Sequence, residues 1–124
     1  MGKIESFRDL EVYKRLFDLA HETYLVTLTF PNFEKFELGS QLRRSSNSAP
    51  ANVAEGWNNK HLNIYLEGIT RALGEVQETD HHLATAKKRE YLTSNQYAHF
   101  ADGYDQCGKM LKGLHRSLER YGLK

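Results

Sequence analysis

The 124-residue chain is poor in cysteine, in proline and in surplus charge of either sign. Its one cysteine, Cys107, cannot form an internal disulfide, so the sequence shows no disulfide framework of the kind found in small secreted domains. Lys and Arg number 17 and Asp and Glu 16, and the net charge of +1 lacks the basic excess of most nucleic-acid-binding domains. Only two prolines are present, so little in the chain interrupts long helices.

Long apolar runs are also missing. No stretch approaches the roughly 20 apolar residues that a membrane-spanning helix needs, and the charged N-terminal segment lacks the apolar centre of a signal peptide. We therefore expect a cytoplasmic protein that does not enter a membrane. The length is that of a single domain, residues 1–124.

Four segments instead show the three- and four-residue spacing of amphipathic helices. The spacing predicts helices over about 9–30, 34–56, 61–90 and 94–121. In the first, the apolar stripe consists of Leu10, Tyr13, Leu16, Phe17, Ala20, Tyr24 and Leu28. Because the helices are long and the turns short, the predicted fold is all-α, an antiparallel up-down-up-down four-helix bundle.

The second helix is unusual because its stripe consists mostly of small residues: Leu38, Leu42, Ser45, Ala49, Val53 and Gly56. Small side chains allow two helix backbones to approach closely, so we expect this helix to pack tightly against a neighbour. Pro50 lies within it and lacks an amide donor, which predicts a bend.

Several segments, in order along the chain, also carry a family resemblance. They are Phe7-Arg8-Asp9-Leu10, Phe30-Pro31 with Glu34 and Glu37, Ser40-Gln41-Leu42-Arg43-Arg44-Ser45, Ala51-Asn52-Val53-Ala54-Glu55-Gly56, Leu73-Gly74-Glu75 and Met110-Leu111-Lys112-Gly113-Leu114. Over nearly its whole length the chain resembles the bacterial four-helix-bundle family named after proteins encoded in intervening sequences of 23S ribosomal RNA genes. That family is similar to the accessory variability determinant of diversity-generating retroelements.

The resemblance implies a helical bundle that assembles as a ring-like homopentamer. For the retroelement members it also implies binding of a reverse transcriptase and of nucleic acid, either RNA or DNA. Most members of the family have no defined activity.

Two adjacent arginines are the first candidate site. Neighbours on a helix point about 100° apart, so one arginine faces another helix and the other faces outward. We assign Arg44 to an ion pair with Glu75 or Glu78 of the next helix, or with Glu37 or Glu55, and Arg43 to phosphate contact, although the spacing leaves the opposite assignment open. Asn52 and Glu55 are interpreted as buried or half-buried polar residues that fix the helix register.

The last helix offers a second candidate site. Lys109, Lys112, Arg116 and Arg120 recur at three- and four-residue steps and predict a basic stripe beside the Leu111–Leu118 seam. A solvated helix face explains such a stripe equally well. Repeated in every subunit of a ring, however, it would produce a field that attracts nucleic acid.

Enzyme chemistry is not favoured by the remaining motifs. Arg15 and His21 have the loose spacing of some helical ribonucleases, but six residues along a helix rotate the two side chains about 240° apart. Asp18-x-x-His21 and Glu78-x-x-His81 resemble half of a di-iron site, without carboxylates from the other two helices. We therefore expect no catalytic residue, no metal and no cofactor.

Aromatic residues near the helix ends predict contacts between subunits. Phe33, Phe36 and Trp57 are expected to be partly exposed, and to join subunits or to seal the bundle ends. The sequence thus favours a non-catalytic, homo-oligomeric interaction protein that binds nucleic acid, a protein, or both. The alternatives are a purely structural oligomer without nucleic-acid affinity and a helical ribonuclease.

Overall fold

The computed structural model describes residues 2–123, which contain helices and no strand. The predicted domain also includes Met1 and Lys124, which lie outside the described residues. The helices are a 3-10 turn at Phe7–Asp9, α1 (Glu11–Thr27), α2 (Asn32–Lys35), α3 (Leu38–Gly56), α4 (Leu62–Lys88) and α5 (Ser94–Tyr121). Within this range no helix has the length and apolar character that crossing a membrane requires.

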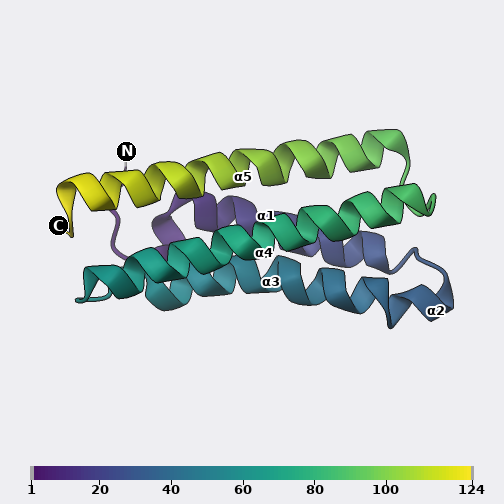
Figure 1. The fold of residues 1–124 in the computed structure, drawn as a ribbon, viewed down its shortest axis with the longest axis horizontal. Helices are drawn as coiled ribbons and strands as arrows, with labels where there is room; N and C mark the ends of the chain where they lie inside the picture. The colour runs from purple at the N-terminus through teal and green to yellow at the C-terminus, as the bar shows by residue number, and fades with distance from the viewer. Residues whose placement is uncertain (1, 124) are drawn as a thin grey trace.

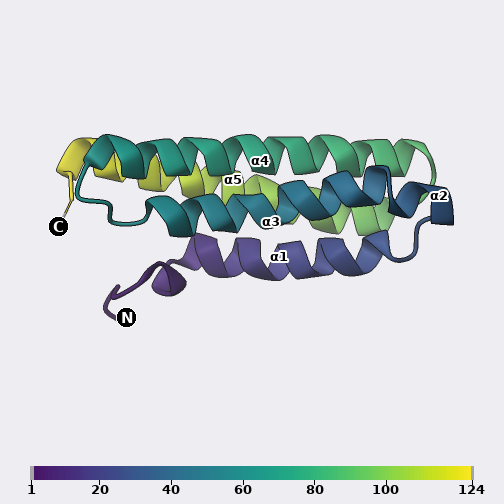
Figure 2. The same ribbon diagram turned by 90° about the horizontal axis from the view of Figure 1, so that it is seen from below.

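The four long helices lie side by side and alternate in direction (Figure 1), which confirms the predicted all-α four-helix bundle. Around the bundle the neighbours are α1–α3, α3–α4, α4–α5 and α5–α1. Both chain ends lie at one end of the bundle, and α2 lies at the other (Figures 1 and 2).

Local chemistry fixes where the helices begin. Thr93 caps α5 by accepting a hydrogen bond from the amide of Gln96 (3.0 Å), and the Gln96 side chain accepts one from the Thr93 amide (2.9 Å). Around the 3-10 turn before α1, the Ser6 hydroxyl accepts a hydrogen bond from the Arg8 amide (3.2 Å), and the Asp9 carboxylate accepts one from the Ser6 amide (3.0 Å). Each pair satisfies two amides that have no partner within the helix.

The α1 stripe predicted from sequence is wrong in part. The buried seam is Val12, Leu16, Leu19, Thr23 and Val26, at alternating steps of four and three residues. Of the predicted stripe, Leu16 is buried, whereas Phe17, Tyr24 and Leu28 are exposed. The physical reason is that α1 is apolar on two faces, so its periodicity alone does not choose the one that faces the core.

The α3 stripe predicted from sequence is confirmed, since all six of its residues are buried. Close packing against α4 follows from two glycines: a Cβ on Gly68 would lie 2.9 Å from the carbonyl oxygen of Asn52 and 3.2 Å from the Cα of Gly56. Farther along the same interface, the hydroxyls of Ser45 and Thr79 hydrogen-bond at 2.7 Å. The helix continues through Pro50 as one element.

Candidate interaction surfaces

The basic residues of α5 lie on its solvent side. Lys109, Lys112, Arg116 and Arg120 are all exposed, whereas Cys107 and Leu111 on the opposite side are buried. Lys109 pairs with Asp105 (3.1 Å), and the Arg120 guanidinium lies 6.0 Å from the Tyr121 ring centroid. Within residues 2–123, Lys112, Arg116 and Arg120 make no ion pair with a carboxylate. This solvent face is the α5 basic face.

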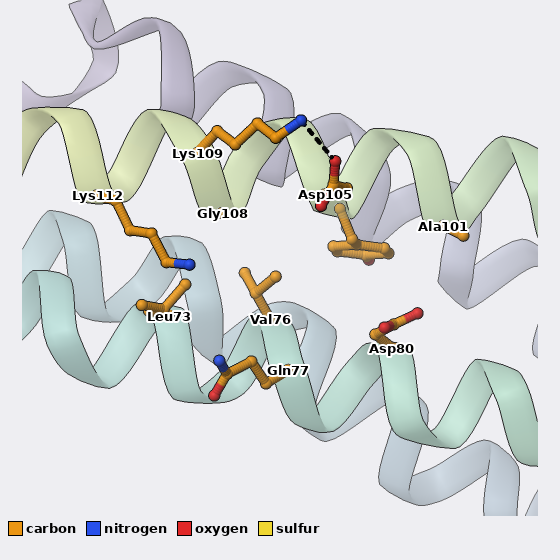
Figure 3. A pocket seen from close by; sticks show the side chains of 10 residues that line it. Leu73, Val76, Gln77, Asp80, Ala101, Asp105, Gly108, Lys109 and Lys112 are labelled. Carbon is orange, nitrogen blue, oxygen red and sulfur yellow. Dashed lines mark ion pairs between the residues drawn. The ribbon is translucent and has the colours of Figure 1, made fainter.

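A shallow trough runs between α4 and α5 next to this face (Figure 3). It comprises two cavities of about 190 and 270 Å³ that share Leu73 and Lys112 in their lining. Asp80 lies at one end, and partial burial together with repulsion from Asp105 raises its pKa. The trough therefore has an acidic end and, at Lys112 and Arg116, a basic end.

Arg44 has the predicted structural role. Its guanidinium pairs with Glu75 (3.2 Å) and with Glu78, both on α4. Hydrogen bonds from Arg44, and then from His82, hold the pKa of Glu78 below its usual value. The half-buried Glu75 therefore takes part in the predicted ion pair, which links α3 to α4.

Arg43, assigned to outward phosphate contact, instead points inward. Its Nη1 donates to the Thr27 hydroxyl (2.9 Å) and its Nη2 to the Lys35 carbonyl (2.6 Å). Thr27 is the last residue of α1 and Lys35 the last residue of α2, so Arg43 links the ends of both helices to α3. The reason is that the predicted helix 34–56 is broken at Phe36–Glu37, so α2 folds back and places its last carbonyl beside Arg43.

Asn52 and Glu55 do not tie α3 to another helix through their side chains. Asn52 is half-buried, but its amide donates to the Ser48 carbonyl of its own helix (2.9 Å). Glu55 is exposed, which contradicts its predicted burial. Here α3 faces α4 through Gly56, so backbone contact rather than a polar side chain sets the register.

Glu34 is a structural polar residue that the sequence analysis did not single out. It is 4% exposed, and its Oε2 accepts hydrogen bonds from the Tyr91 hydroxyl (2.8 Å) and from Arg89 (2.9 Å). These bonds, Tyr91 foremost, hold the pKa of Glu34 below its usual value. Its only sequence signal was a place among the family segments, because its partners lie more than 50 residues away.

The turn after α4 brings those partners into position. The Tyr91 amide donates to the Ala86 carbonyl (2.8 Å) and the Glu90 amide to that of Lys87 (2.9 Å). Glu90 adopts φ 65°, the left-handed conformation that this type of helix end requires. The chain therefore reverses sharply and directs Arg89 and Tyr91 toward α2.

The solvent side of α1 is an apolar surface. Phe17 is 58% exposed, Tyr24 44%, Leu25 48% and Leu28 46%. These four residues are defined as the outer α1 face. Beside it, a cavity of about 400 Å³ lies between α1 and α3, lined by Phe17, Tyr24 and the small residues Ala20 and Ser46. The outer α1 face is the main exposed apolar surface on the long helices.

The residues considered for enzyme chemistry are dispersed. His21 is exposed and stacks on Tyr24 (6.2 Å between ring centroids), and it lies six positions after Arg15 in the unbroken helix α1. Glu78 pairs with Arg44 and His82 rather than with His81. Within residues 2–123, no three His, Cys, Asp or Glu side chains lie close enough to hold a metal ion.

Comparison with known proteins places this bundle in a family. The family model described as 23S rRNA-intervening sequence protein matches residues 8–113, from the 3-10 turn to the middle of α5. Arg116 and Arg120 lie beyond the matched segment. No curated protein matches the chain. Because the match covers most of the sequence, the chain belongs to the 23S rRNA-intervening sequence protein family.

Proposed function

We propose that this chain is a non-catalytic interaction protein that associates with copies of itself through the outer α1 face. One observation carries the proposal: α1 is apolar both toward the core and toward solvent. A helix with two apolar faces is typical of one covered on both sides in its working state.

The size of the surface supports this proposal. A large apolar side chain offers roughly 150–250 Å², so the exposed fractions of the four residues give about 350 Å² of apolar surface. That is in the range of the largest patches on monomeric proteins, which are often functional. The small residues Ala20 and Ser46 beside Phe17 and Tyr24 leave a hollow into which side chains of a second copy would fit.

The proposal that the protein is non-catalytic is supported by carboxylates that form ion pairs and hydrogen bonds within the bundle. Two carboxylates that lie between helices are partnered within the chain: Glu34 by Arg89 and Tyr91, and Glu78 by Arg44. Such groups stabilise the bundle. Ribonuclease activity of the wild type that is lost in Arg15→Ala or His21→Ala would overturn this part.

The test is the mass of the protein in solution, measured by sedimentation velocity and light scattering over a wide concentration range. We expect an oligomer for the wild type and a monomer for Phe17→Ser/Tyr24→Ser. Ile64→Ser is the matched control, because Ile64 is 41% exposed but lies on α4. A monomeric wild type refutes the proposal, and the measured mass also tests the five copies that the family resemblance implies.

A second candidate function, RNA binding, is favoured by the α5 basic face. Lys112, Arg116 and Arg120 are exposed and have no carboxylate partner within residues 2–123. Ring assembly would repeat this set in every subunit and strengthen its field. Lys109 contributes less, because Asp105 neutralises it.

The RNA test is fluorescence anisotropy of a labelled structured RNA at two salt concentrations. Three phosphate contacts predict a loss of affinity of about 20- to 40-fold between 50 and 200 mM salt. Lys112→Glu/Arg116→Glu/Arg120→Glu should abolish binding. Lys87→Glu/Lys88→Glu is the control, because these lysines lie at the far end of α4. Absence of binding by the wild type at low salt removes RNA and leaves the purely structural oligomer.

A further inference from the structure

The short helix α2 has two unlike sides. On one side the Glu34 carboxylate is buried against the bundle. On the other, Phe33 is 69% exposed, and Phe36, the residue directly after α2, is 80% exposed; they are the most exposed large apolar residues of the described chain. Phe30, just before α2, is buried and packs on Tyr91 (5.3 Å between ring centroids), so it already closes this end of the core.

Contacts from two parts of the bundle hold α2 in place. Tyr91 and Arg89, from the turn between α4 and α5, bind Glu34 at 2.8 and 2.9 Å. Arg43 of α3 binds the Lys35 carbonyl at 2.6 Å and, through its other nitrogen, Thr27 of α1 at 2.9 Å. A four-residue helix is not stable by itself, so these bonds determine where its outer side points.

Because α2 is held in place, Phe33 and Phe36 stay exposed to water. A flexible segment of the same sequence could instead turn these side chains toward the protein. Exposed apolar side chains on an ordered element are favourable anchors for binding, because little conformational entropy is lost when they are buried. Glu34 and Arg43 thus act at a distance from any partner, by fixing the element that carries the anchors.

The extent of the surface points to a second copy of this chain as the partner. A stable interface covers about 800 Å² on each partner, and the outer α1 face supplies less than half of that. Phe33 and Phe36 add about 300 Å², which brings the apolar surface to about 650 Å². The two surfaces also follow one another along the chain, since α2 begins five residues after α1 ends.

We infer that α2 is a preformed anchor that inserts Phe33 and Phe36 into a second copy of this chain, with Glu34 and Arg43 as positioning residues. The inference rests on the proposed self-association and specifies which side chains complete that interface. It also gives Arg43 of the adjacent arginine pair a role in assembly that requires no contact with nucleic acid.

The experiment measures the dissociation constant of self-association by sedimentation. Phe33→Ser/Phe36→Ser should weaken association at least tenfold and leave the thermal unfolding of the dilute protein unchanged, because both side chains are exposed. Arg89→Gln/Tyr91→Phe, which releases Glu34 but keeps the ring on Phe30, should weaken association about threefold or more. When Arg89→Gln/Tyr91→Phe is combined with Phe33→Ser/Phe36→Ser, the dissociation constant should not change further. A positioning role acts only through the two phenylalanines, which this variant already lacks.

The outcomes separate the two proposals. If the wild type is a monomer, both fail. If Phe17→Ser/Tyr24→Ser breaks the oligomer while Phe33→Ser/Phe36→Ser leaves it unchanged, only the α2 inference is overturned. Binding to phosphatidylserine vesicles that is lost in Phe33→Ser/Phe36→Ser, with self-association unchanged, would assign the pair to a lipid surface and would also overturn it.

Discussion

The close approach of α3 and α4 makes a quantitative prediction about two glycines of α4. Gly68 faces α3, where an added Cβ would lie 2.9 Å from a backbone carbonyl oxygen. Gly74 is exposed six residues later, and a Cβ there meets nothing within 4 Å. Replacing glycine by alanine within a helix is worth about 1 kcal/mol in helix propensity, and both sites would share this gain.

The two substitutions should nevertheless act in opposite directions. At Gly68 the helices must separate, because a backbone atom cannot rotate away, and overpacking of this kind costs about 1–3 kcal/mol or more. We expect Gly68→Ala to lower the free energy of unfolding by about 1–2 kcal/mol, and Gly74→Ala to raise it by about 0.5–1 kcal/mol. Their midpoints of thermal unfolding should therefore differ by roughly 6–12 °C.

The assay is thermal and urea unfolding followed by circular dichroism at 222 nm. All variants are compared at one protein concentration, since self-association contributes to stability. If Gly68→Ala is as stable as Gly74→Ala, the two backbones are not in contact and the packing argument for the small face of α3 is refuted.

Three further predictions concern buried or paired groups. Arg43→Ala should lower the free energy of unfolding by about 1.5–3 kcal/mol and Arg44→Ala by less than about 1 kcal/mol, because the ion pairs of Arg44 are exposed; equal losses in urea unfolding would contradict this. Thr79→Val should cost about 1–3 kcal/mol by leaving the buried Ser45 hydroxyl unpaired, and adding Ser45→Ala should recover part of that loss in a double-mutant cycle. Burial raises the pKa of the Cys107 thiol to about 11, so native protein should react with iodoacetamide far more slowly than urea-unfolded protein at pH 8. Because the folded-state pKa is the higher one, stability should fall as the pH rises from about 8.5 to about 11.

The helices were predictable because their signals are local. The boundaries of α4 and α5 lie within about two residues of the predicted 61–90 and 94–121, since Thr93 and the apolar periodicity act over one or two turns. The break before α3 was not predictable in this way. Positions 36 and 37 hold neither proline nor glycine, so no local signal marks the break. The contacts that hold α2 come from Arg43, Arg89 and Tyr91, which are distant in sequence.

The candidate site residues also differ in whether local sequence or contacts between distant residues determine their surroundings. Arg44, Glu75 and the α5 cations could be placed by helical spacing, because each depends on which face of one helix it occupies. Arg43 and Glu55 were misplaced, because their surroundings depend on how neighbouring helices are positioned against α3.

Residues close together along the chain are enough to specify four long amphipathic helices, one of which has a face of small residues suited to close packing. This is so because periodicity and capping depend on neighbouring residues. Which of the two apolar faces of α1 enters the core depends instead on how the helices pack together. The buried face includes Thr23, whose hydroxyl forms a 2.8 Å hydrogen bond with the hydroxyl of Tyr104, a residue 81 positions away. The face left outside, with Phe33 and Phe36 beyond it, is consequently the surface on which the proposed assembly depends.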